Sequence, residues 1–262
     1  MNIFSYDSKL VHILNRLTDL MILNLLTIIG LVPIFCLLLT LTGFFALTLL
    51  TVGVSALSVF SGMFLSALHY CLIKMVRNEE SYTFRSFFKS CRDNWKQGSL
   101  IGTLFLLFFG ILWADTRIFA MMPDTGTGGV SAGTVMSVIC YIVMALAYFA
   151  FLYVFPLQAR FVNSVRATLK NSLLIAVLSF PRTLLMAAVW IVVTVLLYFF
   201  SVQIMPFMIL FGISVPAYLC AYIYSPVLRR FEPSEEKATD VDNERTDERV
   251  FTDEKTTDNE SS

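Results

Sequence analysis

The chain of 262 residues is strongly apolar: 57% of its residues are hydrophobic, its mean hydropathy is +0.74 and only 15% are charged. Ordinary soluble domains carry about 25% charged residues, so this composition excludes a typical water-soluble domain. The net charge of zero conceals two parts. Residues 1–231 hold 15 Lys/Arg and 7 Asp/Glu, a charge of +8, and residues 232–262 hold 4 and 12, a charge of −8.

The first apolar stretch, from Leu20 to Ile73, runs for 54 residues without Asp, Glu, Lys or Arg. About 20 apolar helical residues cross a bilayer core of about 30 Å, so this stretch predicts two crossings. The second is long enough to tilt or to break near Gly53. Four more apolar segments follow. We predict an all-α membrane protein with about six transmembrane helices, over residues 17–41, 44–74, 98–119, 131–155, 182–201 and 204–225.

Basic residues predict the orientation of these spans. The N-terminal segment, the links after the second and fourth spans, and the segment after the sixth are basic, whereas the other links carry one Lys or Arg or none. Because positive charges stay on the cytoplasmic side, we expect a multi-pass cell-membrane protein with both termini in the cytoplasm.

Two segments outside the spans have little apolar content. The outer link, residues 122–133, is short and rich in Gly, Thr and Ser, so we expect it to be flexible. The acidic tail, residues 232–262, has too few large apolar side chains to offset its ordering entropy, and we predict that it is disordered. It is interpreted as a solvated spacer or as a segment that folds back on the basic membrane domain of residues 1–231.

The link between the second and third spans contains an amphipathic segment, residues 82–96. Its apolar side chains recur at helical spacing, and its cations recur on another face. We expect a helix lying along the inner membrane surface. It either only orients the neighbouring spans or docks a cytoplasmic partner. Nucleic-acid binding is disfavoured because the rings are committed to lipid. The candidate residues are Phe84, Arg85, Phe87, Phe88, Lys89, Arg92 and Trp95, with Cys91 on the apolar face and Lys96 on the basic face.

The link between the fourth and fifth spans, residues 160–176, repeats this design. Phe161, Val165, Leu169 and Leu173 recur every four residues, and Pro181 ends the predicted helix before the fifth span. Its candidate docking residues are Arg160, Arg166 and Lys170.

Polar residues in the spans are interpreted as parts of hydrogen bonds and ion pairs within the fold and not as catalytic groups. We expect an ion pair between Arg16 and Asp19, a hydrogen-bonded His69, and pairing of Asn24 between helices. The converging acids, bases or metal ligands that an enzyme requires are not evident, so we predict no enzyme and no cofactor. The five cysteines show no CxxC spacing and are interpreted as apolar fillers without a disulfide or metal.

Four segments together resemble the YesL family of bacterial integral membrane proteins, whose function is unknown. They are NRLTDLMILNLL at 15–26, LIKMVRNEESYTFRSFFKSCRDNWKQ at 72–97, FPLQARFVNSVRATLKNSLL at 155–174 and FPRTLL at 180–185. After Val32, Pro33 and Ile34 this chain has about twenty more apolar residues than the family pattern, and the acidic tail is an addition. The resemblance implies an association with carbohydrate uptake or degradation in Gram-positive bacteria and implies no catalytic residue.

Three functions follow as hypotheses. The favoured one is an accessory or regulatory membrane protein, associated with carbohydrate uptake or utilisation, whose basic cytoplasmic helices dock a transporter subunit or another protein. The alternative is a small transporter or channel for a sugar or related solute, in which Tyr148, Gln203 and Tyr218 line a neutral path. The third, an intramembrane enzyme, would depend on Asp19 or His69.

Overall fold

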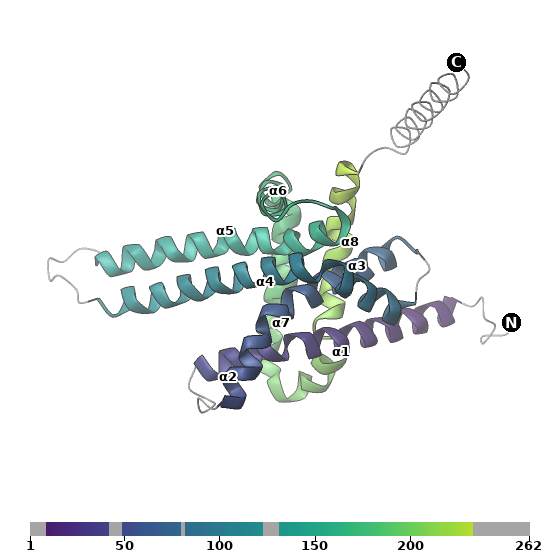
Figure 1. Cartoon of the computed structure of the whole chain (residues 1–262), viewed down its shortest axis with the longest axis horizontal. Helices are drawn as coiled ribbons and strands as arrows, with labels where there is room; N and C mark the ends of the chain where they lie inside the picture. The colour runs from purple at the N-terminus through teal and green to yellow at the C-terminus, as the bar shows by residue number, and fades with distance from the viewer. Residues whose placement is uncertain (1–8, 42–48, 80–81, 123–130, 233–262) are drawn as a thin grey trace, which may run out of the picture. The chain divides into compact units, whose positions relative to one another are not determined.

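The computed structural model describes residues 9–41, 49–79, 82–122 and 131–232 (Figure 1). These residues form α-helices and two short 3-10 helices, without a strand among them, which confirms the predicted all-α class. The chain divides into two compact units, Met1–Ser225 and Pro226–Ser262. In the second, the described residues 226–232 hold the end of α8 and the 3-10 helix Arg229–Phe231. The rest of the acidic tail and residues 123–130 of the outer link lie outside the described residues.

The first long apolar stretch forms α1 (Lys9–Leu41), α2 (Leu49–Ala56), a 3-10 turn (Leu57–Phe60) and α3 (Ser61–Val76). Of the two alternatives for the second span, a tilt or a break near Gly53, the break does not lie at that glycine, because α2 continues through it and the helix changes at the 3-10 turn. A tertiary contact accompanies this turn: the Ser61 hydroxyl donates to the carbonyl of Gly30 on α1, at 2.9 Å.

Helix α4 (Thr83–Ala120) is a single helix of 38 residues, about 57 Å long. The sequence predicted a surface helix over 82–96 and a separate span over 98–119, but the structure has no break between them. Residues 97–114 carry no charge and cover about 27 Å, close to the thickness of a bilayer core. The basic residues before them extend the same helix by about 21 Å.

Helix α5 (Ala132–Arg160) contains the fourth predicted span and extends to Arg160. The following helix, α6 (Val165–Leu178), begins five residues later than the predicted start at 160. The reason is local: the Ser164 hydroxyl accepts a hydrogen bond from the Ala167 amide, which is an N-cap. Arg160 therefore belongs to the last turn of α5.

Helix α7 (Phe180–Phe211) begins with Pro181 in its first turn and is kinked at Phe200, where the backbone leaves the helical region. After residues 212 and 213 the chain continues as α8 (Ser214–Leu228). The sixth predicted span, 204–225, is therefore not one helix. It corresponds to two pieces, Val202–Phe211 and Ser214–Phe231, that are bent by 57°.

The lengths and apolarity of the described helices indicate a membrane protein. Five of them can cross a bilayer, and the bent pair makes six. The five helical segments are Leu10–Leu41, Thr51–Val76, Thr83–Ala120, Ala132–Arg160 and Phe180–Phe200.

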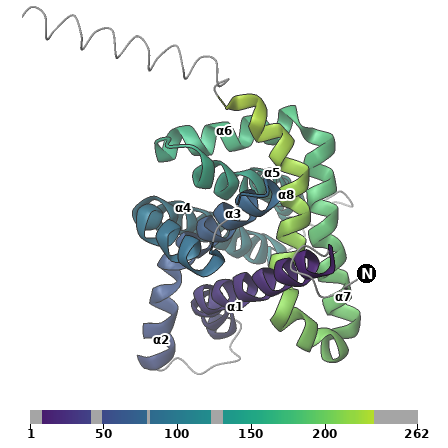
Figure 2. The same cartoon turned by 90° about the vertical axis from the view of Figure 1, so that its right-hand side faces the viewer.

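Close packing of α3 on α4 depends on glycine. A Cβ atom on Gly62 would lie 2.7 Å from the Cα atom of Gly102 and closer still to the carbonyl oxygen of Gly98. Glycines that permit such backbone contact are typical of helix pairs in membranes. Helices α4 and α5 lie side by side, whereas α7 runs across them (Figures 1 and 2). Helix α7 thus meets the other helices at crossings, for example where the Thr183 hydroxyl lies 3.3 Å from that of Tyr153 on α5.

Candidate functional site

The basic surface comprises exposed cations on the first part of α4 and on α6. The side chain of Arg92 is 86% exposed, and its contact of 3.9 Å with Asp93 leaves most of it accessible. A hydrogen bond of 2.6 Å from the Gln97 amide to the carbonyl of Asn163 connects the end of the α4 segment to the chain just before α6. The cations of this surface are Arg85, Lys89, Arg92, Lys96, Arg166 and Lys170, all exposed.

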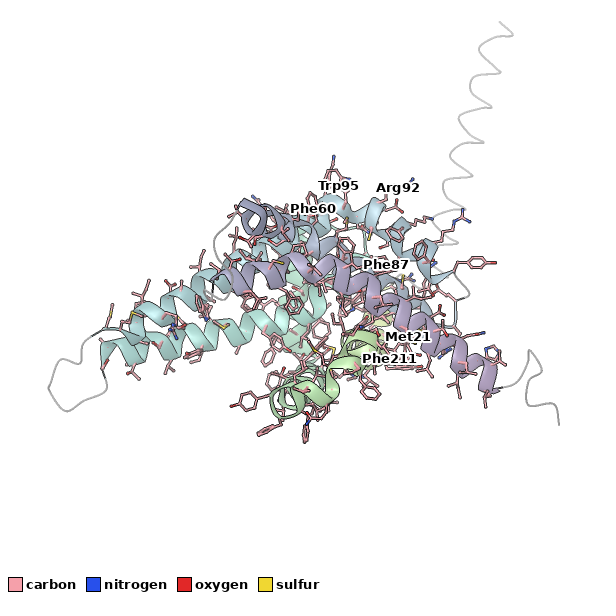
Figure 3. The ribbon with its side chains drawn as sticks, turned by 90° about the horizontal axis from the view of Figure 1, so that it is seen from below. Met21, Phe60, Phe87, Arg92, Trp95 and Phe211 are labelled. Atoms are coloured by element: carbon pink, nitrogen blue, oxygen red, sulfur yellow. The ribbon has the colours of Figure 1, made fainter. Side chains whose placement is uncertain are left out.

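The sequence predicted that the aromatic residues of the α4 segment share one face, but their environments differ. Phe84, Phe88 and Trp95 are about half exposed, but Phe87 is fully buried, and its ring lies 6.2 Å from that of Phe64 on α3. Figure 3 shows Arg92 and Trp95 at the outer edge and Phe87 among the helices. The assignment of Phe87 to a lipid or partner surface is thus corrected, because packing of α3 against α4 covers this ring.

Only some of the apolar residues predicted at every fourth position of α6 pack against other helices. Val165 and Leu169 contact a buried cluster of α4 and α5 residues that includes Ile101, Phe105 and Val154. Leu173, four residues further along, is 45% exposed. Arg160, at the end of α5, is also exposed.

A second feature, the polar cleft, lies where the start of α1, the end of α3 and the start of α4 meet. Its volume is about 740 Å³. Buried Cys71 and Thr83 line it together with half-buried Arg16 and Asp19. The complete lining is His12, Asn15, Arg16, Asp19, Cys71, Met75, Asn78, Glu79, Tyr82 and Thr83.

The ion pair predicted between Arg16 and Asp19 is not formed. Arg16 donates to the Tyr218 hydroxyl, at 3.0 Å, and to Oδ1 of Asn78. Asp19 accepts from the Thr83 hydroxyl, at 2.7 Å. Although the two residues are three positions apart on α1, long-range neutral partners hold their side chains.

Two other predictions for polar side chains are confirmed. His69 and Tyr224 are joined by a hydrogen bond of 3.0 Å between Nδ1 and the hydroxyl. Asn24 is fully buried and bonds between helices, although its partners are backbone groups at the junction of α7 and α8. Its amide donates to the carbonyls of Met208 and Ile209 and accepts from the amides of Ile213 and Ser214.

The three residues proposed to line a neutral sugar path lie in different surroundings. Tyr148 lines an apolar cavity of about 360 Å³ together with Phe105, Phe151 and other residues. Tyr218 bonds to Arg16 and lies 3.0 Å from the hydroxyl of Tyr222, whereas Gln203 is exposed. All five cysteines are free thiols. In the described parts of the chain, no three His, Cys, Asp or Glu side chains lie close enough to hold a metal ion.

The fold thus defines the class of this protein as a helical membrane protein with several candidate spans. Residues 13–116 match a family described as "Protein of unknown function, DUF624". The match extends from α1 to near the end of α4, and it includes the α4 part of the basic surface and every lining residue of the polar cleft except His12. Neither the curated proteins nor the solved structures contain a match to the chain.

Proposed function

We propose that this protein is an accessory or regulatory component of a bacterial cell membrane, and that its basic surface docks a cytoplasmic protein. The observation that supports this most directly is the continuity of α4. The basic residues continue a helix whose next 18 residues are uncharged and long enough to cross the bilayer core. With the positive residues on the cytoplasmic side, this segment projects about 21 Å beyond the core, within reach of a soluble partner.

The composition of the projecting segment fits a protein partner. Half-exposed aromatic rings beside Arg are typical of residues that dominate binding energy at interfaces. The rings of Phe84 and Phe88 lie 4.8 Å apart, and Lys96 lies 5.5 Å from the centre of the Trp95 ring. Since the exposed cations outnumber the acidic Asp93, we expect an acidic partner surface.

We further propose that the partner belongs to a carbohydrate uptake or utilisation system. The support is the similarity to the YesL family, of which the segments at 15–26 and 72–97 fall within the matched residues 13–116. In this role both termini of the chain lie in the cytoplasm, and the protein acts by binding its partner and not by catalysis.

A photo-crosslinking experiment in native membranes tests docking. A photoreactive amino acid at Trp95 should trap a cytoplasmic or permease protein, and Arg92→Glu should reduce the yield at least tenfold, because it replaces an exposed cation of the interface. Arg117→Glu is the matched control, since it makes the same change on the same helix about 37 Å away. That variant should keep the yield within twofold.

Equal yields from the two charge variants would contradict docking at this surface. If the chain binds vesicles of anionic lipid and no partner protein is crosslinked, the basic surface instead orients the helix on the membrane. Uptake of a labelled sugar by liposomes that contain only the purified chain would favour the transporter alternative.

A further inference from the structure

The polar cleft holds opposite charges that do not neutralise each other. Arg16 is bonded to two neutral groups, and in the described structure no ion pair joins it to a carboxylate. Asp19 is likewise bonded to the neutral hydroxyl of Thr83. Glu79, on the exposed rim, has no side-chain partner among the described residues.

The neutral contacts hold these charges in place without using all of their bonding capacity. A guanidinium group has five N–H donors, and the two bonds of Arg16 leave others available. A carboxylate accepts about four hydrogen bonds, and Asp19 accepts one from Thr83. Half-buried charges without a directly bonded countercharge are costly, and a ligand that bonds directly to both charges offsets this cost.

The end of helix α3 positions two of the residues that line the cleft. Asn78 has a φ of 56°, and it is the one non-glycine residue with positive φ in the described chain. This conformation is uncommon for residues other than glycine, and asparagine tolerates it best. The turn places the Asn78 side chain on Arg16 and Glu79 at the rim. Here it ends α3 in a Schellman motif, in which the Asn78 amide donates to the carbonyl of Met75 and the Glu79 amide donates to the carbonyl of Lys74.

We propose that the polar cleft binds a small zwitterion that carries an anionic oxygen group and a primary ammonium group, such as phosphoethanolamine. The anionic group would contact Arg16, and the ammonium group would donate to Asp19 and Glu79. A purely anionic ligand would meet two carboxylates, and a purely cationic ligand would meet the guanidinium. The cleft volume of about 740 Å³ lies within the usual range for small-molecule sites, about 300–1,000 Å³.

Two sources can supply this chemistry: a free zwitterion and the headgroup of a phosphatidylethanolamine lipid. The cleft lies at the ends of α1, α3 and α4 that the basic residues assign to the cytoplasmic side, where headgroups of the inner leaflet are found. The site is separate from the basic surface, so this inference does not depend on docking.

Calorimetry on the full chain in detergent micelles tests the chemistry with four soluble probes. Glycerophosphoethanolamine carries both groups, glycerol phosphate lacks the ammonium, ethanolamine lacks the phosphate, and glycerophosphocholine has no N–H donor. We expect the first to bind at least tenfold more tightly than each of the others. Equal affinities for all four, or no binding of any, would overturn the proposal.

Variants locate the site. Arg16→Gln and Asp19→Asn should each weaken binding of glycerophosphoethanolamine about tenfold, and Glu79→Gln should weaken it several-fold. Because the Glu79 side chain has no structural bond among the described residues, its variant remains informative if the other two fail to fold. Arg117→Gln, outside the cleft, is the control. Unchanged affinity in all three cleft variants would refute this location.

A second experiment, with lipid, distinguishes a free zwitterion from the headgroup of a phosphatidylethanolamine lipid. Native mass spectrometry of the chain released from nanodiscs should detect retained phosphatidylethanolamine, and Glu79→Gln should reduce it. Retention identifies the lipid headgroup as the ligand. Binding of the soluble probe without retention identifies a free zwitterion.

Discussion

Replacement of Asn24 by leucine removes the side chain that joins α1 to the junction between α7 and α8. The Asn24 amide lies between the carbonyl of Ile209 and the amide of Ile213, which would otherwise pair as helix neighbours. It donates at 2.7 Å to the first and accepts at 2.8 Å from the second, and it also accepts from Ser214 at 2.9 Å. A side-chain amide therefore replaces a missing backbone partner at the bend.

The magnitude follows from the groups left without a partner. The carbonyl of Met208 keeps a bond from Gly212 at 2.9 Å, but three other backbone groups lose theirs. An unsatisfied buried backbone group costs about 1–3 kcal/mol, whereas interhelical hydrogen bonds in membranes average about 0.6 kcal/mol. Leucine is similar in size to asparagine, so the loss comes mainly from the three unpaired backbone groups. At about 1 kcal/mol for each group, we expect the free energy of unfolding to fall by about 3 kcal/mol.

Unfolding by SDS in mixed micelles measures this loss, and hydrogen exchange at Ile213 and Ser214 locates it. Asn15→Leu is the matched control, because it makes the same change at an exposed position of the same helix. It should change the free energy of unfolding by less than about 0.5 kcal/mol. If Asn24→Leu is equally harmless and both amides exchange as slowly as before, the proposed role of this side chain is wrong.

Two further predictions concern packing of α3 on α4. Gly62→Leu should separate these helices and destabilise the protein by about 3 kcal/mol or more in the same unfolding assay, because even a Cβ atom collides with the backbone of α4. Gly110→Leu should be tolerated, since a Cβ atom added to Gly110 would have no atom within 4 Å apart from the adjacent residues and the nearby backbone of its own helix, and equal losses would contradict this packing. Phe87→Ala should cost about 3–5 kcal/mol, as expected for a buried phenylalanine, and Phe88→Ala, at a 46% exposed ring, should cost less than half as much. Reversal of that order would show that the buried and exposed faces of α4 are misassigned.

Several boundaries were predictable because their causes are local. Pro181 lies in the first turn of α7, and the preceding helix ends before it, as predicted, at Leu178 instead of residue 176. The Ser164 cap is equally local, but the apolar spacing from residue 161 onward obscured it and the predicted start of α6 was too early. The continuity of α4 through residue 97 was missed because a change from basic to apolar composition indicates a change of environment and not a change of helix axis.

In the polar cleft, the spacing of residues along one helix does not reveal the partners of their side chains. Positions three apart on a helix predicted an ion pair of Arg16 with Asp19, but each side chain has a closer competitor from a distant segment. Tyr218 is 202 positions from Arg16, and Thr83 is 64 positions from Asp19. Phe87 was similarly assigned to an outer face because the pattern of one helix does not show which side a neighbouring helix covers.

An all-helical membrane protein with about six spans was predictable from the sequence, because transfer of a segment to lipid depends mainly on that segment's own composition. The described helices bear out the all-helical class and provide five candidate spans, or six with the bent pair. Tertiary structure alone decided that Asn24 completes the bend between α7 and α8, that Phe87 is buried, and that Arg16 and Asp19 face one cleft without pairing. These features depend on which segments distant in sequence lie together, and packing of whole helices sets that proximity.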